Sequence, residues 1–476
     1  MNYKEALSNL SQYEQEHILR FWAGLSDVEQ AGLLAQIESI ELDLMKRLAD
    51  EWILNEPPAE RFSVIKPVPT IPQADRTQDD AREAWDTGEA ALRAGRVGLL
   101  LVAGGQGTRL GFDGPKGAYP IGPVSKRSLF AFHAEKIHNT QRRYGCTLPW
   151  YIMVSDTNEA ATRVFFDEHD FFGLNKKDVT FFTQRMVPCM DDQGKFMLES
   201  RHSIAMNPNG HGGTILAVVD SGIAEDARRR GVDTLSYFQV DNWTLKVADP
   251  FFIGYHVLRG GEMSSKIHRK TEPRESVGVH CICDGQYRTI EYSELDIYPQ
   301  LLETDANGRP VYYAGNPAIH IMSVEFVERV YKNFREFPWH RAHKKIPYID
   351  LSGAMVKPDK PNGYKFETFV FDALRFTVHD PIALEIPRAG EYTPIKQFSG
   401  ENSVEEAWRS MREYWADWIE AAGHKVSRRS DGADAIEIEI SPRFALSKDE
   451  FLEKANQLTF PEKDANICIL PDGTLL

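Results

Sequence analysis

A short apolar run followed at once by a glycine-rich turn is the feature that most constrains the fold of this chain. The run is Val97–Ala103, and no charged residue interrupts it. A continuous apolar run of this length is typical of a strand that is buried on both faces, as in a parallel sheet. Gly104, Gly105 and Gly107 follow directly. The pattern therefore predicts a buried strand that ends in a sharp turn at the edge of a sheet.

Further apolar segments repeat this pattern, and amphipathic segments separate them. The predicted strands are Trp150–Ser155, Val179–Phe182 and Leu235–Val240, and the predicted helices are Asp79–Arg93, Ser128–Tyr144 and Glu159–His169. Thr77 is expected to cap the first of these helices. Strands and helices that alternate in this way predict a doubly wound α/β domain.

The remaining segments extend this domain at both ends. Residues 1–55 have apolar residues at three- and four-residue spacing, which predicts helices. Val277–Cys283 and Arg288–Tyr292 predict antiparallel strands, whereas Ser403–Ala422 predicts a Trp-rich amphipathic helix and Ala435–Ile440 a half-buried strand. We expect the aromatic side chains of that helix to be packing residues. The predicted division is an N-terminal helical segment with a connector at 1–78, a main α/β domain at 79–398, and a small C-terminal α/β domain at 399–476.

Composition and charge exclude several classes of protein. The chain has 476 residues and a formal net charge of −15, which argues against nonspecific binding to nucleic acid or to anionic lipid. No apolar stretch reaches the length of a membrane helix, and the polar amino-terminal sequence does not resemble a signal peptide. We therefore expect a cytoplasmic protein whose five cysteines are reduced thiols. The basic cluster at His340–Lys345 is interpreted as the solvated end of a helix.

The glycine-rich turn carries the strongest chemical signal. Successive backbone N–H groups in such a turn form a concave anion site, and Arg109 and Lys116 add positive charge beside it. The spacing does not fit a P-loop, because Lys116 is followed by Gly117 rather than by serine or threonine. It does not fit the dinucleotide-binding fingerprint either, because Leu110 stands where a glycine is required. The turn therefore predicts a phosphate site of another kind, and an NAD-dependent oxidoreductase is disfavoured.

The turn is similar to the Gly-Gly-x-Gly-Thr-Arg-Leu…Pro-Lys signature of sugar nucleotidyltransferases. More narrowly, Leu100–Phe130 resembles the eukaryotic-type UDP-N-acetylglucosamine pyrophosphorylases. The resemblance runs over most of the chain, through the segments Gln15–Trp22, Asn207–Gly213, Val240–Asn242, Lys246–Pro250, Glu291–Glu294, Ala314–Asn316, Lys344–Tyr348, Lys357–Gly363, Phe369–Phe371 and Thr393–Lys396. It implies a Rossmann-like, GT-A-like nucleotidyltransferase domain with a mixed sheet.

The resemblance also implies a reaction: direct in-line attack of a sugar 1-phosphate on UTP, which releases pyrophosphate without a covalent enzyme intermediate. Arg109, Lys116 and Lys396 would be the catalytic residues, and Asp241 would bind Mg²⁺. The residues implied in nucleotide binding are Ala103, Gly104, Gly105, Gly107, Thr108, Gln184, Gly210 and His211. Those implied in sugar binding are Gly278, Glu291, Asn316, Phe369 and Phe371. Core packing is an equally good interpretation of the two phenylalanines. The chain is expected to act as a monomer or a homodimer.

One position departs from the family pattern. The sequence has His211 where N-acetylglucosamine enzymes have asparagine, and a Gly-His-Gly segment is reminiscent of UDP-glucose pyrophosphorylases. Imidazole can donate a hydrogen bond to a sugar or ribose hydroxyl, so binding is compatible with this change. N-acetylglucosamine 1-phosphate is the expected substrate. The alternatives are glucose, galactose or N-acetylgalactosamine 1-phosphate, and a catalytically inactive UDP-sugar-binding protein.

Overall fold

A computed structural model describes residues 1–55, 60–73, 79–426, 436–460 and 466–476. Thr77 and Ala435, two residues used in the sequence-based predictions, lie outside these ranges. The chain divides into two compact units, each made of three separate stretches. The smaller unit contains Met1–Arg61, Gln184–Leu216 and Arg335–Asp372, and the larger unit contains Phe62–Thr183, Ala217–Phe334 and Ala373–Leu476. The predicted division at residues 78 and 398 stays a prediction.

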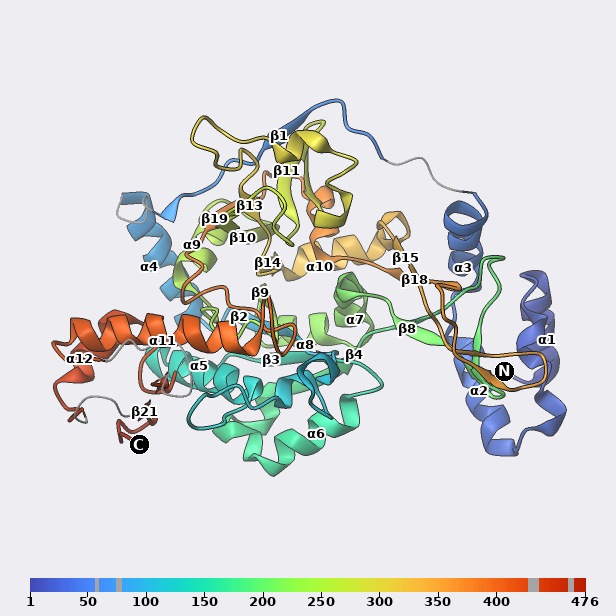
Figure 1. The fold of residues 1–476 in the computed structure, drawn as a ribbon, viewed down its shortest axis with the longest axis horizontal. Helices are drawn as coiled ribbons and strands as arrows, with labels where there is room; N and C mark the ends of the chain where they lie inside the picture. The colour runs from blue at the N-terminus through green and yellow to red at the C-terminus, as the bar shows by residue number, and fades with distance from the viewer. Residues whose placement is uncertain (56–59, 74–78, 427–435, 461–465) are drawn as a thin grey trace. The chain divides into compact units, whose positions relative to one another are not determined.

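A mixed sheet forms the centre of the larger unit (Figure 1). Its members are β1 (Ile65–Pro67), β2 (Val97–Val102), β3 (Trp150–Val154), β4 (Val179–Thr183), β9 (Thr234–Gln239), β10 (Met263–Arg269), β11 (Val279–Cys283), β12 (Gln286–Ile290), β13 (Ala314–Gly315), β14 (His320–Ser323) and β19 (Ile382–Glu385). The main path runs in the order β1-β11-β13-β10-β14-β9-β2-β3-β4, with β12 paired to β11 and β19 to β10. The expected α/β fold with a mixed sheet is confirmed.

The parallel part of this sheet is the part that the apolar runs predict. β2 pairs in parallel with β3 on one side and with β9 on the other, and β3 pairs in parallel with β4. The chain thus moves outward from β2 through β3 to β4 and then returns to add β9 at the opposite side of β2. In open α/β sheets this reversal marks a topological switch point, where ligands bind beyond the carboxyl ends of the strands.

Capping residues in the sequence help to set where helices of the larger unit begin and end. Their bounds are α4 (Asp79–Arg93), α5 (Leu129–Tyr144), α6 (Glu159–Glu168), α8 (Ile223–Arg229), α9 (Pro250–Leu258), α10 (Val324–Lys332), α11 (Val404–Ala421) and α12 (Lys448–Ala455). The hydroxyl of Ser128 accepts a hydrogen bond from the Ala131 N–H and so caps α5. The same helix ends at Gly145, whose φ of 62° is a left-handed conformation that glycine adopts without strain.

The C-terminal segment packs into the same core. The Trp415 ring of α11 contacts Trp243 at a centroid distance of 5.9 Å, and the Trp418 ring contacts Phe451 of α12 at 5.9 Å. These contacts confirm that the aromatic residues of α11 are packing residues. The strand predicted at Ala435–Ile440 is present as β20 (Ile438–Ile440), which pairs in parallel with β21 (Ile467–Ile469).

The smaller unit combines helices with short two-stranded sheets. Its elements are α1 (Tyr3–Gln12), α2 (Asp27–Ser39), α3 (Leu42–Ala49), β5 (Met186–Pro188), β6 (Leu198–Ser200), β7 (Ser203–Ile204), β8 (Met206–Pro208), β15 (His340–Lys344), β16 (Tyr348–Ile349), β17 (Met355–Val356) and β18 (Gly363–Glu367). A further helix, α7 (Thr214–Asp220), crosses the boundary between the two units. The helix end predicted for His340–Lys345 is wrong, because these residues form β15 and pair with β18. His343 stacks on Tyr364 of that partner strand at 4.6 Å, a long-range contact that local charge does not reveal.

Two negative findings concern the described residues. No helix among them combines the length and apolar character that crossing a bilayer demands. All five cysteines lie in the described ranges, and none of them forms a disulfide. Four of the five thiols are buried, as expected for cysteines that serve as small apolar packing groups.

Four buried histidines make the stability of the larger unit sensitive to acid. Burial lowers the pKa of His133, His268 and His280 to about 3, and that of His256 to about 4. Their pKa in the unfolded chain is about 6.5, so the unfolded chain binds more protons below that pH and folding is progressively opposed. We expect the urea midpoint of unfolding to decrease between pH 7 and pH 5, each histidine contributing up to about 1.4 kcal/mol per pH unit.

Two variants sharpen this measurement. His280→Gln should flatten the dependence of the urea midpoint on pH, because it removes one buried imidazole. His202→Gln is the comparison at a side chain that is 43% exposed, and it should change the slope less than His280→Gln does. A midpoint that stays constant from pH 7 to pH 5 in the parent protein would contradict the assignment.

Candidate active site

The glycine-rich turn and Asp241 follow two neighbouring strands of the sheet. Val102, the last residue of β2, pairs with Gln239, the last residue of β9. The Val240 N–H then donates to the Val102 carbonyl oxygen at 3.1 Å, which keeps the two chains together for one more residue. The residues that follow β2 and β9 therefore leave the sheet side by side at the switch point, where α/β folds bind ligands.

Side chains that follow β3 hold the glycine-rich turn in place. The Asn158 amide donates to the Ala103 carbonyl oxygen at 2.8 Å and to that of Gly105 at 3.2 Å. The Ser155 hydroxyl donates to the Gly104 carbonyl oxygen at 2.8 Å. Sequence reasoning did not identify Asn158, although its position just after a predicted parallel strand was a usable signal. These bonds fix the carbonyl groups of the turn and thereby orient its N–H groups.

The turn presents backbone donors that nothing else uses. Within the described part of the chain, no hydrogen bond takes up the N–H groups of Gly104, Gly105 and Gln106. The Lys116 N–H donates to the Gly105 carbonyl oxygen at 3.0 Å, which folds the Pro115–Lys116 segment back over the turn. Successive free N–H groups form a concave site for an anion. Arg109 is exposed beside them.

Lys116 and Asp241 form an ion pair at this point. The Lys116 ammonium lies 2.8 Å from an Asp241 carboxylate oxygen, and the two side chains are 16% and 13% exposed. Burial opposes ionisation of Asp241, but the positive charge of Lys116, with a smaller contribution from Lys396, holds the pKa of that carboxyl below its usual range. Two of the predicted lysines, Lys116 and Lys396, therefore act on the ionised carboxylate of Asp241.

Lys396 reaches this place because its segment is hydrogen-bonded to the Asp241 segment. The Ile395 N–H donates to the Asp241 carbonyl oxygen at 3.1 Å. The Asn242 side chain donates to the Glu391 carbonyl oxygen at 2.9 Å and accepts from the Thr393 N–H at 3.0 Å. Asn242 is only 2% exposed, so these bonds are shielded from water. Two segments that are 150 residues apart in the sequence are thus joined through one asparagine.

The residues present fit a magnesium ion whose ligands come partly from the protein and partly from a substrate. Among the described residues, no three histidine, cysteine or acidic side chains gather closely enough to hold a metal by themselves. Mg²⁺ is commonly bound by one or two carboxylates together with substrate phosphates rather than by an all-protein cage. Asp241, a single ionised carboxylate beside a turn of free N–H groups, matches that pattern.

Gly278, Glu291 and Asn316 form a second cluster in the larger unit. The Asn316 N–H donates to the Gly278 carbonyl oxygen at 2.9 Å. A Cβ atom on Gly278 would lie 2.7 Å from a Glu291 carboxylate oxygen, so a larger residue here would require that carboxylate to move. The side-chain oxygen of Asn316 accepts from the Ala318 N–H at 2.9 Å, which turns its amide nitrogen toward other partners.

Tyr392 is influenced by carboxylates of both the Asp241 site and this cluster, and sequence reasoning did not identify it. Burial raises the pKa of Tyr392 to about 12, and the carboxylates of Asp241 and Glu291 both contribute to that increase. Its ring stacks on His268 at a centroid distance of 4.5 Å. Both carboxylates are therefore close enough to Tyr392 to influence its ionisation, although neither neighbours it in the sequence.

In the smaller unit, two predicted motifs pack against each other. The Thr368 N–H and hydroxyl both donate to the Asn209 carbonyl oxygen at 2.8 Å, and the Gly212 N–H donates to the Thr368 carbonyl oxygen at 2.8 Å. Gly210 has a φ of 82°, and a Cβ there would lie 2.4 Å from the Thr368 carbonyl oxygen. The structure thus gives Gly210 a packing reason of its own, apart from any approach of a nucleoside.

His211 is held by the Phe369–Phe371 segment. Its Nδ1 accepts a hydrogen bond from the Val370 N–H at 3.1 Å, and its ring stacks on Phe369 at 5.2 Å. Burial lowers the pKa of His211 to about 4, so the imidazole is neutral near pH 7. With Nδ1 acting as the acceptor, the proton is on Nε2, which can serve as a donor. Phe371 packs on the same imidazole, so both phenylalanines have a packing role.

The other predicted residues are placed as follows. Thr108 is exposed on the turn, Gly107 is buried beneath it, and Ala103 is buried at the end of β2. Gln184 is 8% exposed and begins the second stretch of the smaller unit. The predicted residues are thus divided between the two units.

A double-mutant cycle on the Lys116–Asp241 pair tests the coupling that this geometry predicts. Lys116→Met leaves a mostly buried carboxylate without its partner, and we expect it to lower the free energy of unfolding at pH 7 by about 1–3 kcal/mol. Lys116→Met combined with Asp241→Asn should recover part of that loss, with a coupling of about 1–2 kcal/mol in urea denaturation.

The exposed pair Lys176–Asp167 is the matched control. Its ions lie 2.7 Å apart, but its side chains are 70% and 59% exposed, so the same pair of substitutions should show no measurable coupling. If the effects at Lys116 and Asp241 were simply additive, the two groups would not stabilise each other in solution.

Comparison with known proteins identifies the relatives of this chain. The family model described as UTP–glucose-1-phosphate uridylyltransferase matches residues 53–410. The chain is 38% identical to human UDP-N-acetylhexosamine pyrophosphorylase-like protein 1, over 83% of this chain and 80% of the relative. It is 34% identical to UDP-N-acetylglucosamine pyrophosphorylase of Saccharomyces cerevisiae, over 91% of this chain and 93% of the relative.

A solved structure extends the likeness to the fold. The uridine diphosphate N-acetylglucosamine pyrophosphorylase from Trypanosoma brucei, crystallised with an inhibitor, superposes with a TM-score of 0.80 at 25% identity. The match covers 97% of this chain and 98% of that chain. The resemblance that the glycine-rich turn and the ordered motifs indicate is therefore confirmed, and the chain belongs to the UTP–glucose-1-phosphate uridylyltransferase family.

Proposed function

We propose that this chain transfers the uridylyl group of UTP to N-acetylglucosamine 1-phosphate and releases pyrophosphate and UDP-N-acetylglucosamine. The observation that carries the proposal is the arrangement of Lys116, Asp241 and Lys396 beside the free N–H groups of the glycine-rich turn. The relatives named as UDP-N-acetylglucosamine pyrophosphorylases, which align over nearly the whole chain, support the choice of sugar.

The chemistry needs charge neutralisation rather than a protein nucleophile. A phosphate oxygen of the sugar 1-phosphate attacks the α-phosphorus of UTP, and a new phosphorus–oxygen bond forms. The bond from that phosphorus to the bridging β-phosphate oxygen breaks, and pyrophosphate leaves with the electron pair. The attacking phosphate oxygen is already ionised near neutral pH, so no general base is required. The protein must hold two anions in line and stabilise the charge that develops.

The larger unit supplies groups suited to each part of this task. The N–H groups of Gly104 and Gly105 would hold the β- and γ-phosphates, and Arg109 would add a mobile positive charge beside them. Lys116 would stabilise charge on the transferred phosphoryl group. Lys396 would contact the phosphate of the sugar from the opposite side. Asp241 holds the Lys116 ammonium at 2.8 Å, on the segment that folds back over the glycine-rich turn.

Mg²⁺ is the proposed cofactor, with Asp241 as its protein ligand. When bound, the ion would neutralise charge on the phosphates of UTP and help to orient them. The Asp241 carboxylate is ionised at neutral pH, because Lys116 holds its pKa low, so it is ready to serve as a ligand.

Asn316, Glu291 and Gly278 are the proposed contacts of the sugar. The amide nitrogen of Asn316 would donate to the N-acetyl carbonyl oxygen, because its side-chain oxygen already accepts from the Ala318 N–H. Glu291 would accept hydrogen bonds from sugar hydroxyls, and Gly278 would leave room beside the ring.

The predicted roles of the smaller unit stay proposals. Gln184 offers a donor and an acceptor that suit a uracil edge, and the Nε2 of His211 offers a donor for a hydroxyl. Phe369 and Phe371 would form an apolar wall. A cytoplasmic location, a monomeric or homodimeric state, and the lack of nucleic-acid and membrane partners likewise stay predictions.

The direct test is pyrophosphate release from UTP with a panel of sugar 1-phosphates, with and without Mg²⁺. We expect strong release with N-acetylglucosamine 1-phosphate, weak release with glucose, galactose and N-acetylgalactosamine 1-phosphates, and almost none with ATP, CTP or GTP. Omission of Mg²⁺ should abolish the reaction. Release only with glucose 1-phosphate or galactose 1-phosphate would overturn the sugar assignment, and release with no sugar would identify a catalytically inactive UDP-sugar-binding protein.

Active-site variants belong in the same assay. Lys116→Ala and Asp241→Ala should each lower kcat by about 10²-fold or more, as is usual for the loss of a preorganised charge stabiliser. Circular dichroism should show that both variants keep their fold. Near-normal turnover by either variant would refute the role proposed for that residue.

A further prediction concerns selection of the N-acetyl group. Asn316→Ala should lower kcat/KM for N-acetylglucosamine 1-phosphate by roughly 3- to 10-fold, the worth of one hydrogen bond, and leave turnover of glucose 1-phosphate nearly unchanged. Asn307→Ala, at an exposed position in the same unit, is the control and should leave kcat/KM for both sugar phosphates unchanged. An equal decrease in kcat/KM for both sugar phosphates would mean that Asn316 does not bind the N-acetyl group.

A further inference from the structure

A network of four charged residues, three of them buried, joins the segments that follow Asp241 and precede Lys396. The Lys266 ammonium is 2.6 Å from a Glu391 carboxylate oxygen and 2.7 Å from an Asp249 carboxylate oxygen, and all three side chains are at most 4% exposed. Lys246 adds a second cation, 3.1 Å from the other Glu391 oxygen. Two lysines thus balance two carboxylates, and the network is neutral as a whole.

The network connects the segments that carry the catalytic groups. Glu391 precedes Lys396 by five residues, and Lys246 follows Asp241 by five residues. Asp249 caps α9 by accepting from the Phe251 N–H at 3.1 Å, while Lys266 projects from β10 of the central sheet. The Glu391 carboxylate therefore attaches both catalytic segments to the rigid framework of the larger unit.

Other bonds make this connection specific. The Asn242 side chain spans the two segments through the Glu391 carbonyl oxygen and the Thr393 N–H. On the far side of the Asp241 segment, the Lys136 ammonium of α5 donates to the carbonyl oxygens of Trp243 and Leu245. The backbone on either side of Asp241 is thus held by polar groups.

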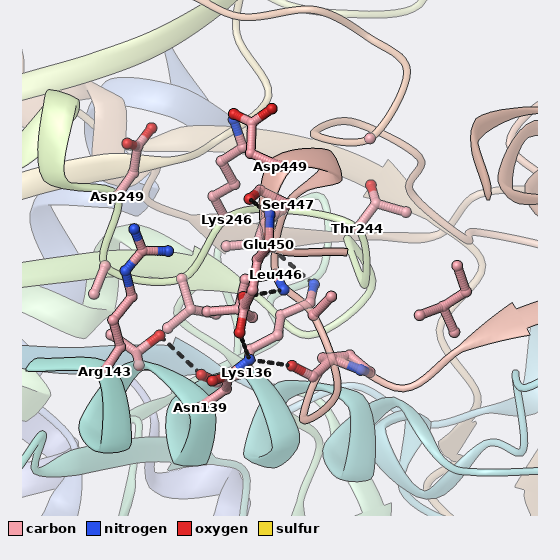
Figure 2. Close-up of a pocket in the computed structure, with 18 of the residues that line it drawn as sticks. Lys136, Asn139, Arg143, Thr244, Lys246, Asp249, Leu446, Ser447, Asp449 and Glu450 are labelled. Carbon is pink, nitrogen blue, oxygen red and sulfur yellow. Dashed lines mark hydrogen bonds between the residues drawn. The ribbon is translucent and has the colours of Figure 1, made fainter. Parts of the chain in front are cut away.

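Packing alone does not hold this segment. A cavity of about 740 Å³ opens along it, and Figure 2 shows Lys136, Thr244, Lys246 and Asp249 on its walls. Trp243 and Leu245 of the segment pack into the hydrophobic core, but its polar side faces this cavity and has no close-packed neighbours there. On that side the hydrogen bonds and ion pairs that cross the segment help to fix its position.

We propose that Glu391 is a positioning residue, whose carboxylate, held by Lys266 and Lys246, keeps the Lys396 segment in register with Asp241 and Lys116. This inference rests on the catalytic roles proposed above for Asp241 and Lys396. Glu391 touches no reacting atom and acts through the place at which it holds Lys396. Buried ion pairs are weak sources of stability compared with apolar residues of the same size, so a positional role gives this network a reason to be ionic.

The consequence is a large kinetic effect from a small displacement. Glu391→Gln keeps the shape of the side chain but leaves two cations facing a single carboxylate. The segment that carries Lys396 should shift in response, and a misplacement of about 1 Å at a reacting centre can cost 10²-fold in rate. We therefore expect Glu391→Gln to lower kcat by about 10- to 100-fold, with the KM for UTP within about twofold of the parent value.

A double-mutant cycle with Lys396→Ala tests the route of this effect. If Glu391 acts through Lys396, then Glu391→Gln should cost less than about threefold in kcat once Lys396 is already alanine. If the two losses multiply, Glu391 acts on the protein generally and the proposal is wrong. Unchanged kcat in the single variant Glu391→Gln also overturns it.

A matched variant separates position from stability. Glu450→Gln makes the same change at another mostly buried carboxylate, which is paired with Lys454 at 2.6 Å and is 13% exposed. It should lower the urea midpoint without lowering kcat. If it lowers kcat as much as Glu391→Gln does, the effect of the latter is one of stability and the proposal fails.

Two arms keep the experiment decisive. Should Glu391→Gln not fold, Lys246→Gln removes the more exposed cation of the network, and it should lower kcat several-fold and again be non-additive with Lys396→Ala. An additive result there overturns the proposal.

Activity of the parent protein shows which proposal a negative result contradicts. If the parent makes no UDP-sugar, the proposed function is wrong. If the parent is active and Glu391→Gln does not change kcat, only the positioning role is wrong.

Discussion

Parallel pairing of β2 with β9 is the constraint on which the active site depends. The two strands end opposite each other, at Val102 and Gln239, so the turn after β2 and the carboxylate after β9 leave the sheet side by side. The glycine-rich turn then supplies free N–H groups, while Asp241 supplies negative charge for Lys116 to meet. Neither feature would form a site alone, because the turn lacks an anchor for a cation and Asp241 lacks a phosphate-binding surface. The switch point in the sheet is what combines them.

Charged side chains in a poorly solvated site are unfavourable unless they are paired, and this protein pairs them with one another. Asp241 pairs with Lys116, and Glu391 and Asp249 pair with Lys266, so that carboxylates and ammonium groups compensate each other in a poorly solvated region. Pairing of this kind contributes little net stability. It does hold ionised groups at defined distances, and phosphoryl transfer requires charges that are in position before the reaction begins. The same buried charges that add little to the free energy of unfolding are therefore the charges that the proposed reaction uses.

Local signals in the sequence were enough for most elements of the central sheet and its helices. β2 and β3 are continuous apolar runs, β4 and β9 are rich in apolar and aromatic residues, and α5 has a serine at one end and a glycine at the other, so each could be located within about two residues. Long-range contacts explain what was missed. β15 was interpreted as a helix end because its pairing with β18 is invisible in its own basic sequence. Asn158, Tyr392 and Glu391 are important through partners 50 or more residues away, and of the three only Asn158, which follows a predicted strand, stands at a position that the sequence marks.

A long-range contact also explains His211, the position that departs from the family pattern. Its Nδ1 accepts from the Val370 N–H, and burial keeps the ring neutral. The side-chain oxygen of asparagine is also a hydrogen-bond acceptor, and it lies the same number of bonds from Cβ as one of the imidazole nitrogens does. Histidine can therefore make the backbone contact that asparagine would make, while it retains a donor on Nε2. The change is thus compatible with either sugar, because its first role is to join two segments of the smaller unit. The contact proposed for the N-acetyl group is instead Asn316, whose side-chain oxygen already accepts from the Ala318 N–H in the larger unit.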